Sequence, residues 1–280
     1  AFLRAGLVDE VKVFLAPKLV SGSDDPNRAP RLKTPLVTRV GDGVRAALVE
    51  RCGELDIALV ALGGSVSTTF VFTYDAAGVR TLRLRARARG ITAADLPAAL
   101  PRPDAVVFGS IAHELGAALY ASLRGAVRVV AAQGYLRTWD VDGLVRPRPW
   151  DDAVDVLTEV DAAVVSEEDL AGDEGVARGW SRIAPAIVVT VAERGAHLWR
   201  DGARDDVAGF PVVAVDQTGA GDAFAAGLAL SLAEGRAMVE AVRFANAVAS
   251  FAVQGPGTSA LGDRAAAEAR LLGSELRGAT

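Results

Sequence analysis

The feature that most constrains the fold is a regular alternation of short apolar segments with helical segments. The apolar segments, each predicted to be a strand, lie at residues 105–108, 127–131, 162–165 and 187–191. The predicted helical segments lie between them at residues 115–123, 150–157 and 167–180. Strands that are apolar throughout and are connected by helices predict a parallel sheet that is covered on both faces. We therefore expect the α/β class, with a three-layer, doubly wound and mainly parallel sheet.

An arginine-rich hairpin is predicted ahead of this region. Residues 67–74 and 79–86 alternate between two kinds of side chain, and the turn formers at 75–78 join them. Alternation with a period of two is typical of strands with two unlike faces. The second arm and its continuation carry Arg80, Arg83, Arg85, Arg87 and Arg89. We interpret this run as a solvated strand edge that its charge protects from aggregation, and we expect residues 55–90 to form a small lid or edge strands.

The composition fits one large domain over residues 1–280. Hydrophobic residues make up 51% of the chain, which is enough for a sizeable core. The formal net charge of −5 argues against a general surface for nucleic acid or for anionic membranes. No apolar run in the sequence approaches the roughly 18 residues that a membrane-spanning helix needs. We therefore expect neither nucleic acid nor a membrane as a partner.

The one cysteine and two histidines of the chain argue against an intramolecular disulfide and against a zinc site. Cys52 is the single cysteine, so an intramolecular disulfide is excluded and the cytoplasm is the expected location. The two histidines, His113 and His197, lie far from this cysteine and from each other in the sequence. They give no ligand cluster of the zinc type.

The segment Asp216–Asp222 carries the strongest functional signal. An apolar segment at residues 210–215 predicts a strand before it, and a helix-forming segment follows it. A strand, a glycine-bearing turn and a helix start place backbone N–H groups at the positive end of a helix dipole, which is a geometry that binds anions. Gly219 and Gly221 allow a tight turn and a close approach by a ligand. A carboxylate at Asp222 suits a base that acts on a hydroxyl next to phosphates, but an ordinary capped helix start explains the same residues.

Several loops resemble, in the same order, the motifs of one kinase family. Asp216–Phe224, with the sequence DQTGAGDAF, is similar to the C-terminal signature of the ribokinase-like (PfkB) family of carbohydrate and nucleoside kinases. Val189–Ala196 resembles the family's nucleotide-site strand and loop. Phe244–Ala249 and Gly255–Thr258 resemble its adenine-side helix and terminal loop, and the hairpin also has a counterpart. The resemblance covers residues from about 36 to 262 and implies an ATP-dependent kinase with a ribokinase-like fold.

The resemblance also assigns roles to individual residues. Asp222 would be the base that takes the proton from the acceptor hydroxyl. Gly219, Ala220 and Gly221 would offer backbone N–H groups to the charge on the transferred phosphoryl group. The residues that the resemblance places on the nucleotide side are Asp216, Thr218, Thr190, Glu193, Gly195, Asn246, Gly255 and Gly257.

Ser166 and Asp169 stand where the family has Asn-x-x-Glu, a motif linked to magnesium and phosphate positioning. Oxygen ligands suit Mg²⁺, often through water, so the resemblance implies ATP and Mg²⁺, and in several relatives a monovalent cation near these loops. Helix capping by Ser166 explains the same pattern. Arg137 lies where many relatives carry Asn-x-Arg and could reach an anionic group of the substrate, and His113 follows a strand end. A surface arginine and a simple loop histidine are the alternatives.

The N-terminal segment 1–33 departs from the family pattern. The family's early strand with an acidic residue, and its Gly-Gly-x-x-x-Asn segment, have no match in residues 1–35. Residues 6–20 are loosely similar to riboflavin-pathway reductases but bring no nicotinamide site. The leading hypothesis is a kinase that acts on a hydroxyl of a sugar, a sugar-like compound or a nucleoside. The alternative is a non-catalytic nucleotide-binding relative that has lost part of the sugar pocket. The hairpin could also pair across a homodimer.

Overall fold

The computed structural model describes most of the chain after the N-terminal segment. The described residues are 34–40, 50, 57–74, 80–96, 98, 103–256 and 259–278. The atypical segment 1–33, the predicted hairpin turn at 75–78 and Gly257 lie outside the described residues.

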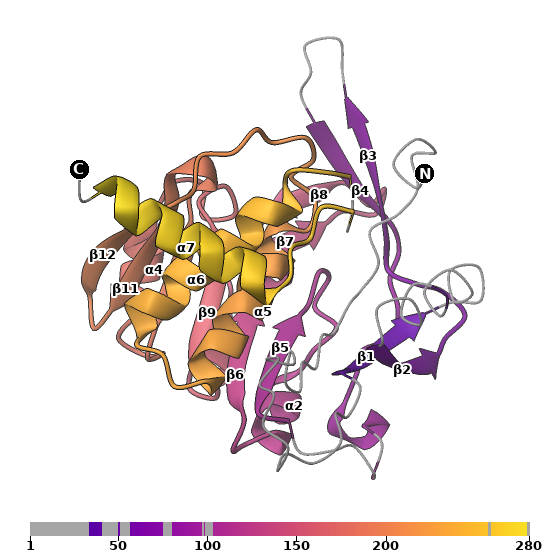
Figure 1. Ribbon diagram of the computed structural model, residues 1–280. Helices are drawn as coiled ribbons and strands as arrows, with labels where there is room; N and C mark the ends of the chain where they lie inside the picture. The colour runs from indigo at the N-terminus through magenta and orange to yellow at the C-terminus, as the bar shows by residue number, and fades with distance from the viewer. Residues whose placement is uncertain are drawn as a thin grey trace.

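The centre of the fold is a six-stranded sheet with the strand order β12-β11-β10-β9-β6-β5 (Figure 1). Its strands are β5 (Ala105–Gly109), β6 (Val127–Ala131), β9 (Ala162–Ser166), β10 (Ile187–Thr190), β11 (Gly195–Arg200) and β12 (Ala203–Ala208). Strands β5, β6, β9 and β10 run parallel to one another, while β11 and β12 add an antiparallel edge. The expected mainly parallel α/β sheet is therefore confirmed, and the carboxyl ends of four strands share one edge.

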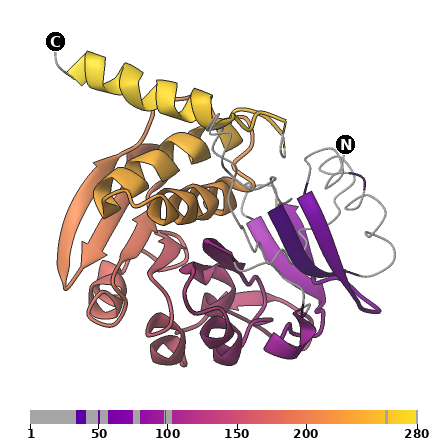
Figure 2. The ribbon, with the colours of Figure 1, turned by 60° about the horizontal axis from the view of Figure 1, so that its bottom comes forward.

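Helices cover both faces of this sheet (Figure 2). One face carries α2 (Ala117–Ser122), α3 (Ala153–Leu157) and α4 (Glu174–Trp180); the other carries α5 (Ala220–Ala233) and α6 (Met238–Ala252), with α7 (Arg264–Gly278) packed on α6. In β5, Val106 and Phe108 belong to the core with α2–α4, whereas Ala105 and Val107 belong to the core with α5 and α6. Because both faces are covered, each strand is apolar at nearly every position, which explains the pattern that predicted the sheet.

Smaller elements stand beyond β5 at the right-hand side of Figure 1. There β1 (Thr34–Val40) pairs in parallel with β2 (Ile57–Gly63), and β3 (Thr69–Tyr74) forms an antiparallel hairpin with β4 (Arg80–Ala86). A second hairpin joins β7 (Arg137–Trp139) to β8 (Val145–Pro147). Single helical turns are η2 (Ala93–Asp95), η3 (Ala132–Leu136) and η4 (Ala192–Arg194). The hairpin predicted from the sequence is present, while its role as a lid stays a prediction.

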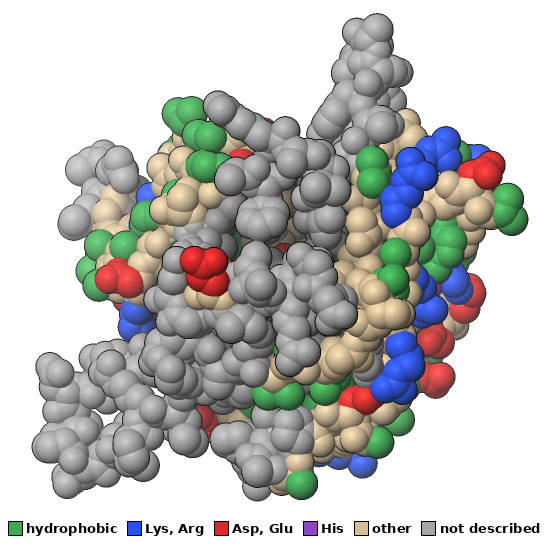
Figure 3. Space-filling model, turned by 90° about the vertical axis from the view of Figure 1, so that its right-hand side faces the viewer, with side chains coloured by type: hydrophobic (Ala, Val, Ile, Leu, Met, Phe, Trp, Pro, Cys, Tyr) green, Lys and Arg blue, Asp and Glu red, His purple; other side chains and the backbone are tan. Residues whose placement is uncertain are grey.

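The arginines around β4 anchor the hairpin, which corrects in part their interpretation as a solvated edge. Arg83 donates a hydrogen bond to the carbonyl of Asp142 at 3.2 Å. Arg87 donates to the carbonyls of Ala112 and His113 at 2.7 and 2.6 Å. On the face shown in Figure 3, acidic side chains are interspersed with basic ones among the described residues, and these form no continuous basic patch there.

The prediction of a strand at residues 210–215 is wrong. The segment is a loop in which Val213 is 82% and Val215 is 66% exposed. The N–H of Val215 donates to the carbonyl of Val253 at 2.7 Å, just beyond the end of α6. The last residue of this segment is therefore bonded to a helix end and not to a neighbouring strand, and Val213 and Val215 cover no sheet face.

Three other elements differ from the sequence-based expectations. The helix α4 begins only at Glu174, because the side chain of Asp173 caps it by accepting from the N–H of Gly175 at 2.9 Å. The pair β11–β12 was not predicted, since β12 buries only Val207 among its six residues. The helix α7 was not predicted either, and it buries Ala267 against Phe244 of α6.

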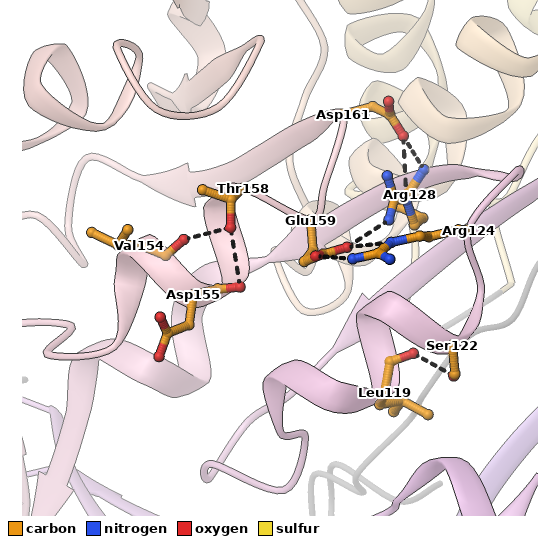
Figure 4. A network of polar contacts seen from close by, with 9 residues as sticks. All are labelled: Leu119, Ser122, Arg124, Arg128, Val154, Asp155, Thr158, Glu159 and Asp161. Atoms are coloured by element: carbon orange, nitrogen blue, oxygen red, sulfur yellow. Dashed lines mark hydrogen bonds and ion pairs between the residues drawn. The ribbon is translucent and has the colours of Figure 1, made fainter.

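Ion pairs close the edge of the sheet that holds the amino ends of β6 and β9 (Figure 4). Arg124 pairs with the carboxylate of Glu159, and Arg128 Nη1 lies 3.3 Å from the same carboxylate. The backbone N–H of Arg128 donates to Asp161 Oδ2 at 2.7 Å. Hydrogen bonding from Arg124 lowers the pKa of the Glu159 carboxyl. The carboxylate of Glu159 at this edge thus already has cationic partners within the protein.

Gly134 of η3 offers a test of how closely two loops must approach at the opposite edge. Its N–H donates to the carbonyl of Ser110 at 3.1 Å, and a Cβ atom at this position would lie 2.3 Å from that carbonyl oxygen. We expect Gly134→Ala to lower the free energy of unfolding by about 1–3 kcal/mol, because the backbone has to shift. Urea denaturation monitored by circular dichroism measures this change.

The matched control is Gly179→Ala in α4, where a Cβ atom would meet nothing within 4 Å. This variant should raise the free energy of unfolding by about 0.5–1 kcal/mol through helix propensity. Equal effects of the two substitutions would contradict the close approach of the loops.

Candidate active site

The turn before α5 has the backbone geometry that the sequence predicts for an anion site. Gly219 is the N-cap residue with φ of 85°, in the left-handed region that favours glycine. The side chain of Asp216 accepts a hydrogen bond from the N–H of Thr218 at 2.9 Å, which shapes the turn. The N–H of Ala223 donates to the carbonyl of Gly219 at 2.9 Å. The start of an α-helix in general offers backbone N–H groups that can bind an anion.

Gly221 leaves open space beside Asp222 at this helix start. Among the described residues, a Cβ atom at Gly221 would meet no atom within 4 Å apart from its chain neighbours and its own helix backbone, and Asp222 is exposed in the first turn. Packing within the protein therefore does not require a glycine at this position, whereas a ligand that approaches the backbone closely would. Phe224 and Ala225 are buried against the sheet directly afterwards, so the start of the helix is held firmly.

Some predicted nucleotide-side residues gather at the carboxyl ends of β9 and β10. Thr190 ends β10 and is the register partner of Ser166, which ends β9. The N–H of Glu167 donates to the carbonyl of Thr190 at 3.0 Å, and an ion pair joins Glu167 to Arg194 of η4. Glu193 lies exposed in η4. Two neighbouring loops are thus joined at the edge where open α/β sheets bind their ligands.

Three further nucleotide-side predictions fall on residues with roles inside the fold. Gly195 has φ of 105°, and a Cβ atom there would lie 2.3 Å from the carbonyl oxygen of Val207. Asn246 is buried, and its side-chain amide donates to the carbonyls of Val207 and Ala208, each at 3.2 Å. Gly255 is buried, and a Cβ atom there would lie 2.7 Å from a serine oxygen. Their contact with a nucleotide stays a prediction, as does that of Gly257.

The predicted metal-side residues contact each other. The hydroxyl of Ser166 donates to Asp169 Oδ2 at 2.6 Å and accepts from the N–H of Asp169 at 3.0 Å. Residues 167–172 form turns and α4 begins only at Glu174 with Asp173 as its cap, so the interpretation of Ser166 as a helix cap is wrong; the Ser166–Asp169 contacts shape the turn after β9 instead. Among the described residues, no three His, Cys, Asp or Glu side chains form a group that could hold a metal ion. The oxygen atoms of this pair suit an indirect contact with Mg²⁺ through water, which is how that ion often meets a protein.

Arg137 and His113, the two residues predicted to lie on the side of the phosphoryl acceptor (the acceptor-side residues), lie together, although they come from different loops. His113 Nε2 donates to the carbonyl oxygen of Arg137 at 2.5 Å. The guanidinium of Arg137 lies 5.7 Å from the ring centroid of Phe70 in β3. The ring of His113 meets that of Trp139 edge-on at 5.6 Å. Both residues therefore lie where the hairpin β3–β4 joins the loops after β5 and β6, and their contact with a substrate stays a prediction.

Glu114 was not predicted as a site residue, and it is the most deeply buried carboxylate near His113 and Arg137. Its exposed fraction is 2%, and its side chain accepts hydrogen bonds from four neighbouring groups. The available signal was a single carboxylate in the stretch 105–123, which has no other Asp, Glu, Lys or Arg. A charge in such a place requires hydrogen-bonding partners.

Comparison with known proteins finds a match between residues 138–264 and the model of the pfkB family carbohydrate kinases. A fructokinase from Klebsiella pneumoniae is 32% identical over 224 residues, which are 70% of this chain and 70% of that protein. An inositol 3-kinase from Zea mays is 35% identical over 127 residues, which are 45% of this chain but only 33% of the relative.

A solved structure with a similar fold is that of a pyrophosphate-dependent kinase in the ribokinase family, complexed with a pyrophosphate analog and myo-inositol. It gives a TM-score of 0.67 with 22% identity, and the match covers 81% of this chain and 82% of that one. The likeness supports the ribokinase-like arrangement of sheet and helices.

Asn246 gives a test that separates a role in the fold from contact with a nucleotide. We expect Asn246→Ala to lower the free energy of unfolding by about 1–3 kcal/mol, because the buried carbonyl of Val207 and the partly buried carbonyl of Ala208 lose this donor. Asn246→Asp should cost more, since it turns a carboxylate oxygen towards the same carbonyls. Thermal and urea unfolding measure both effects. Unchanged unfolding together with weaker ATP binding would favour direct contact with the nucleotide instead.

Proposed function

Because the chain belongs to the pfkB family of carbohydrate kinases, we propose that it transfers the terminal phosphoryl group of ATP to a hydroxyl of a sugar or sugar-like acceptor. The observation that carries this proposal is the start of α5, where the exposed Asp222 follows the open backbone of Gly221. A base beside an anion-binding backbone suits phosphoryl transfer, in which a protein mainly positions groups and stabilises charge. Relatives named as a fructokinase and an inositol kinase support an acceptor with several hydroxyl groups.

In the proposed reaction, Asp222 takes the proton of the acceptor hydroxyl while the hydroxyl oxygen attacks the terminal phosphorus of ATP. A new P–O bond forms, the bond from that phosphorus to the bridging oxygen breaks, and ADP leaves with the electron pair. Backbone N–H groups of Gly219, Ala220 and Gly221 would stabilise the charge on the transferred group. The N–H of Ala220 also contacts the carbonyl of Gln217 at 3.3 Å, so this donor would be shared.

Mg²⁺ would neutralise charge on the phosphates of ATP in this scheme. Ser166 and Asp169 offer oxygen atoms at the end of β9 and in the loop after it. We propose that they orient water around the ion, since Mg²⁺ usually keeps several waters beside phosphate oxygens. Thr190, the register partner of Ser166, would then lie on the same side of the nucleotide.

The central prediction concerns Asp222→Asn, which keeps the size of the side chain but removes the base. We expect kcat to fall by about 10²–10⁴-fold, the contribution typical of general acid–base catalysis, with little change in the KM of ATP. A coupled assay for ADP release, run with the best acceptor found, measures both constants.

The matched control is Asp155→Asn, because Asp155 is also an exposed aspartate in the first turn of a helix, α3. Asp155 is one of the residues drawn in Figure 4, and it lies away from the proposed site. Its kcat should stay within about twofold of the parent value, since it changes only an exposed helix-dipole interaction. If Asp222→Asn behaves like this control, Asp222 is not the base.

A non-catalytic nucleotide-binding protein is the second candidate. The observation that favours it is the absence of the family's sugar-binding segments from residues 1–35. Calorimetry with ATP should be combined with an acceptor panel of sugars, cyclic polyols and nucleosides, using ATP and then pyrophosphate as the donor. ATP binding without turnover on any acceptor, with either donor, would support this candidate over the kinase.

Three finer parts of the proposal rest on the sequence: a homodimer formed through the hairpin β3–β4, a monovalent cation near the nucleotide loops, and location in the cytoplasm. The described part of the chain has no helix of the length and apolar character needed to cross a bilayer. Sedimentation of the purified protein tests the homodimer. Activity in potassium salts compared with tetramethylammonium salts tests the cation.

A further inference from the structure

Glu114 is a buried carboxylate held by uncharged hydrogen-bond donors. Its Oε2 atom accepts from the hydroxyl of Ser110 at 2.9 Å and from the N–H groups of Ile111 and Ala112 at 3.1 and 2.8 Å. Its Oε1 atom accepts from the hydroxyl of Thr68 at 2.9 Å. Three of the donors belong to its own loop after β5, while the fourth belongs to the segment that enters the hairpin β3–β4. Removing a carboxylate from water is costly, so this arrangement needs a reason beyond filling space.

The same residue fastens both legs of the hairpin. Thr68 lies directly before β3, and its hydroxyl oxygen also accepts from the N–H of Ala88, two residues after β4, at 2.9 Å. The backbone carbonyl of Glu114 accepts from the N–H of Ile91 at 2.9 Å. The side chain of Glu114 therefore holds the entering leg, and its carbonyl holds the leaving leg. Both legs of the hairpin are thus bonded to this one residue of the loop after β5, directly or through Thr68.

The fastened hairpin carries contacts to both predicted acceptor-side residues. Arg87, one residue before Ala88, donates to the carbonyls of Ala112 and His113. Phe70, two residues after Thr68, is 1% exposed and has the guanidinium of Arg137 over its ring. The hairpin thus touches the loop after β5 and the loop after β6. The predicted nucleotide-side loops follow β9 and β10, farther along the strand order of the sheet.

We propose that Glu114 is a positioning residue for the acceptor. It sets the hairpin β3–β4 against the loops that carry His113 and Arg137, and so determines how tightly the acceptor binds without touching the phosphate donor. This inference rests on the proposed kinase function for its kinetic consequence. The fastening of the hairpin itself is independent of any activity, and the two parts are tested separately.

The first experiment compares KM values for acceptor and donor. Glu114→Gln replaces one accepting oxygen by a donating NH₂ group, which then faces other donors. Thr68→Val keeps the shape of the side chain but removes the hydroxyl that links Ala88 to Glu114. We expect either change to raise the KM of the acceptor about tenfold or more, the scale of a lost hydrogen bond to a charged group. The KM of the donor should stay within about twofold, because the loops after β9 and β10 are untouched.

Two control variants accompany these measurements. Thr68→Ser keeps the hydroxyl and should restore the parent KM of the acceptor. Thr158→Val removes an exposed hydroxyl that bonds only within α3 and its end, and should change neither constant. Equal rises in the two KM values, or a loss confined to thermal stability, would overturn the positioning role.

The second experiment measures hydrogen exchange of the backbone and needs no substrate. In Glu114→Gln and Thr68→Val, the amides of Ala88 and the β3–β4 strands should exchange about tenfold faster or more, whereas those of β9 and β10 should keep the parent rates. Unchanged exchange in the hairpin would overturn the proposal even if the enzyme is active. Faster exchange in a protein that phosphorylates no acceptor would uphold the fastening by Glu114 and reject the kinase function.

Discussion

The site depends on a sheet that is buried on both of its faces. β5, β6, β9 and β10 run parallel, so the chain must cross back over the sheet between them, and α2, α3 and α4 lie in these connections on one face. The later helices α5 and α6 cover the other face, so that alternate side chains of the strands are buried on both sides. The loops that leave their carboxyl ends must then meet at one edge. His113, Arg137, Ser166 and Thr190 all lie at that edge, although they are spread widely through the sequence. At the opposite edge, Arg124 and Arg128 pair with Glu159, so these charged groups have partners within the protein.

The same burial explains which elements could be predicted from the sequence. The four parallel strands are apolar at nearly every position, because both faces are covered, and this pattern is visible in one sequence. The edge strand β12 buries only Val207, so nothing in its composition distinguishes it from a polar loop. For residues 210–215 the error is the opposite one, since a loop was predicted to be a strand. They are apolar, but their backbone bonds to the residue after α6 and Val213 stays exposed. Apolar composition indicates a tendency to be buried and does not identify the partner.

The glycines show how far the site itself could be predicted. Gly195, Gly219 and Gly221 look alike in the sequence, and each was assigned to the site from its place in a motif. Gly195 is required by positive φ and by the oxygen of Val207, and Gly219 by positive φ alone. Gly221 has neither requirement in the part of the chain that the structure describes, since a Cβ atom there would meet nothing beyond its own helix within 4 Å. Only the backbone conformation separates a glycine that the fold requires from one that a ligand could require.

Glu114 escaped prediction because its partners come from two distant parts of the chain. Its own loop supplies three donors, but the fourth, Thr68, lies 46 residues earlier, and the sequence shows no relation between them. An apolar side chain could fill the same volume and would avoid the cost of burying charge. An apolar side chain would not fix the orientation of the hairpin, because apolar contacts have no preferred direction. Hydrogen bonds do have one. In the proposed role, a carboxylate that accepts from the hairpin and from the loop after β5 fixes how the two are oriented, which determines where His113 and Arg137 are held.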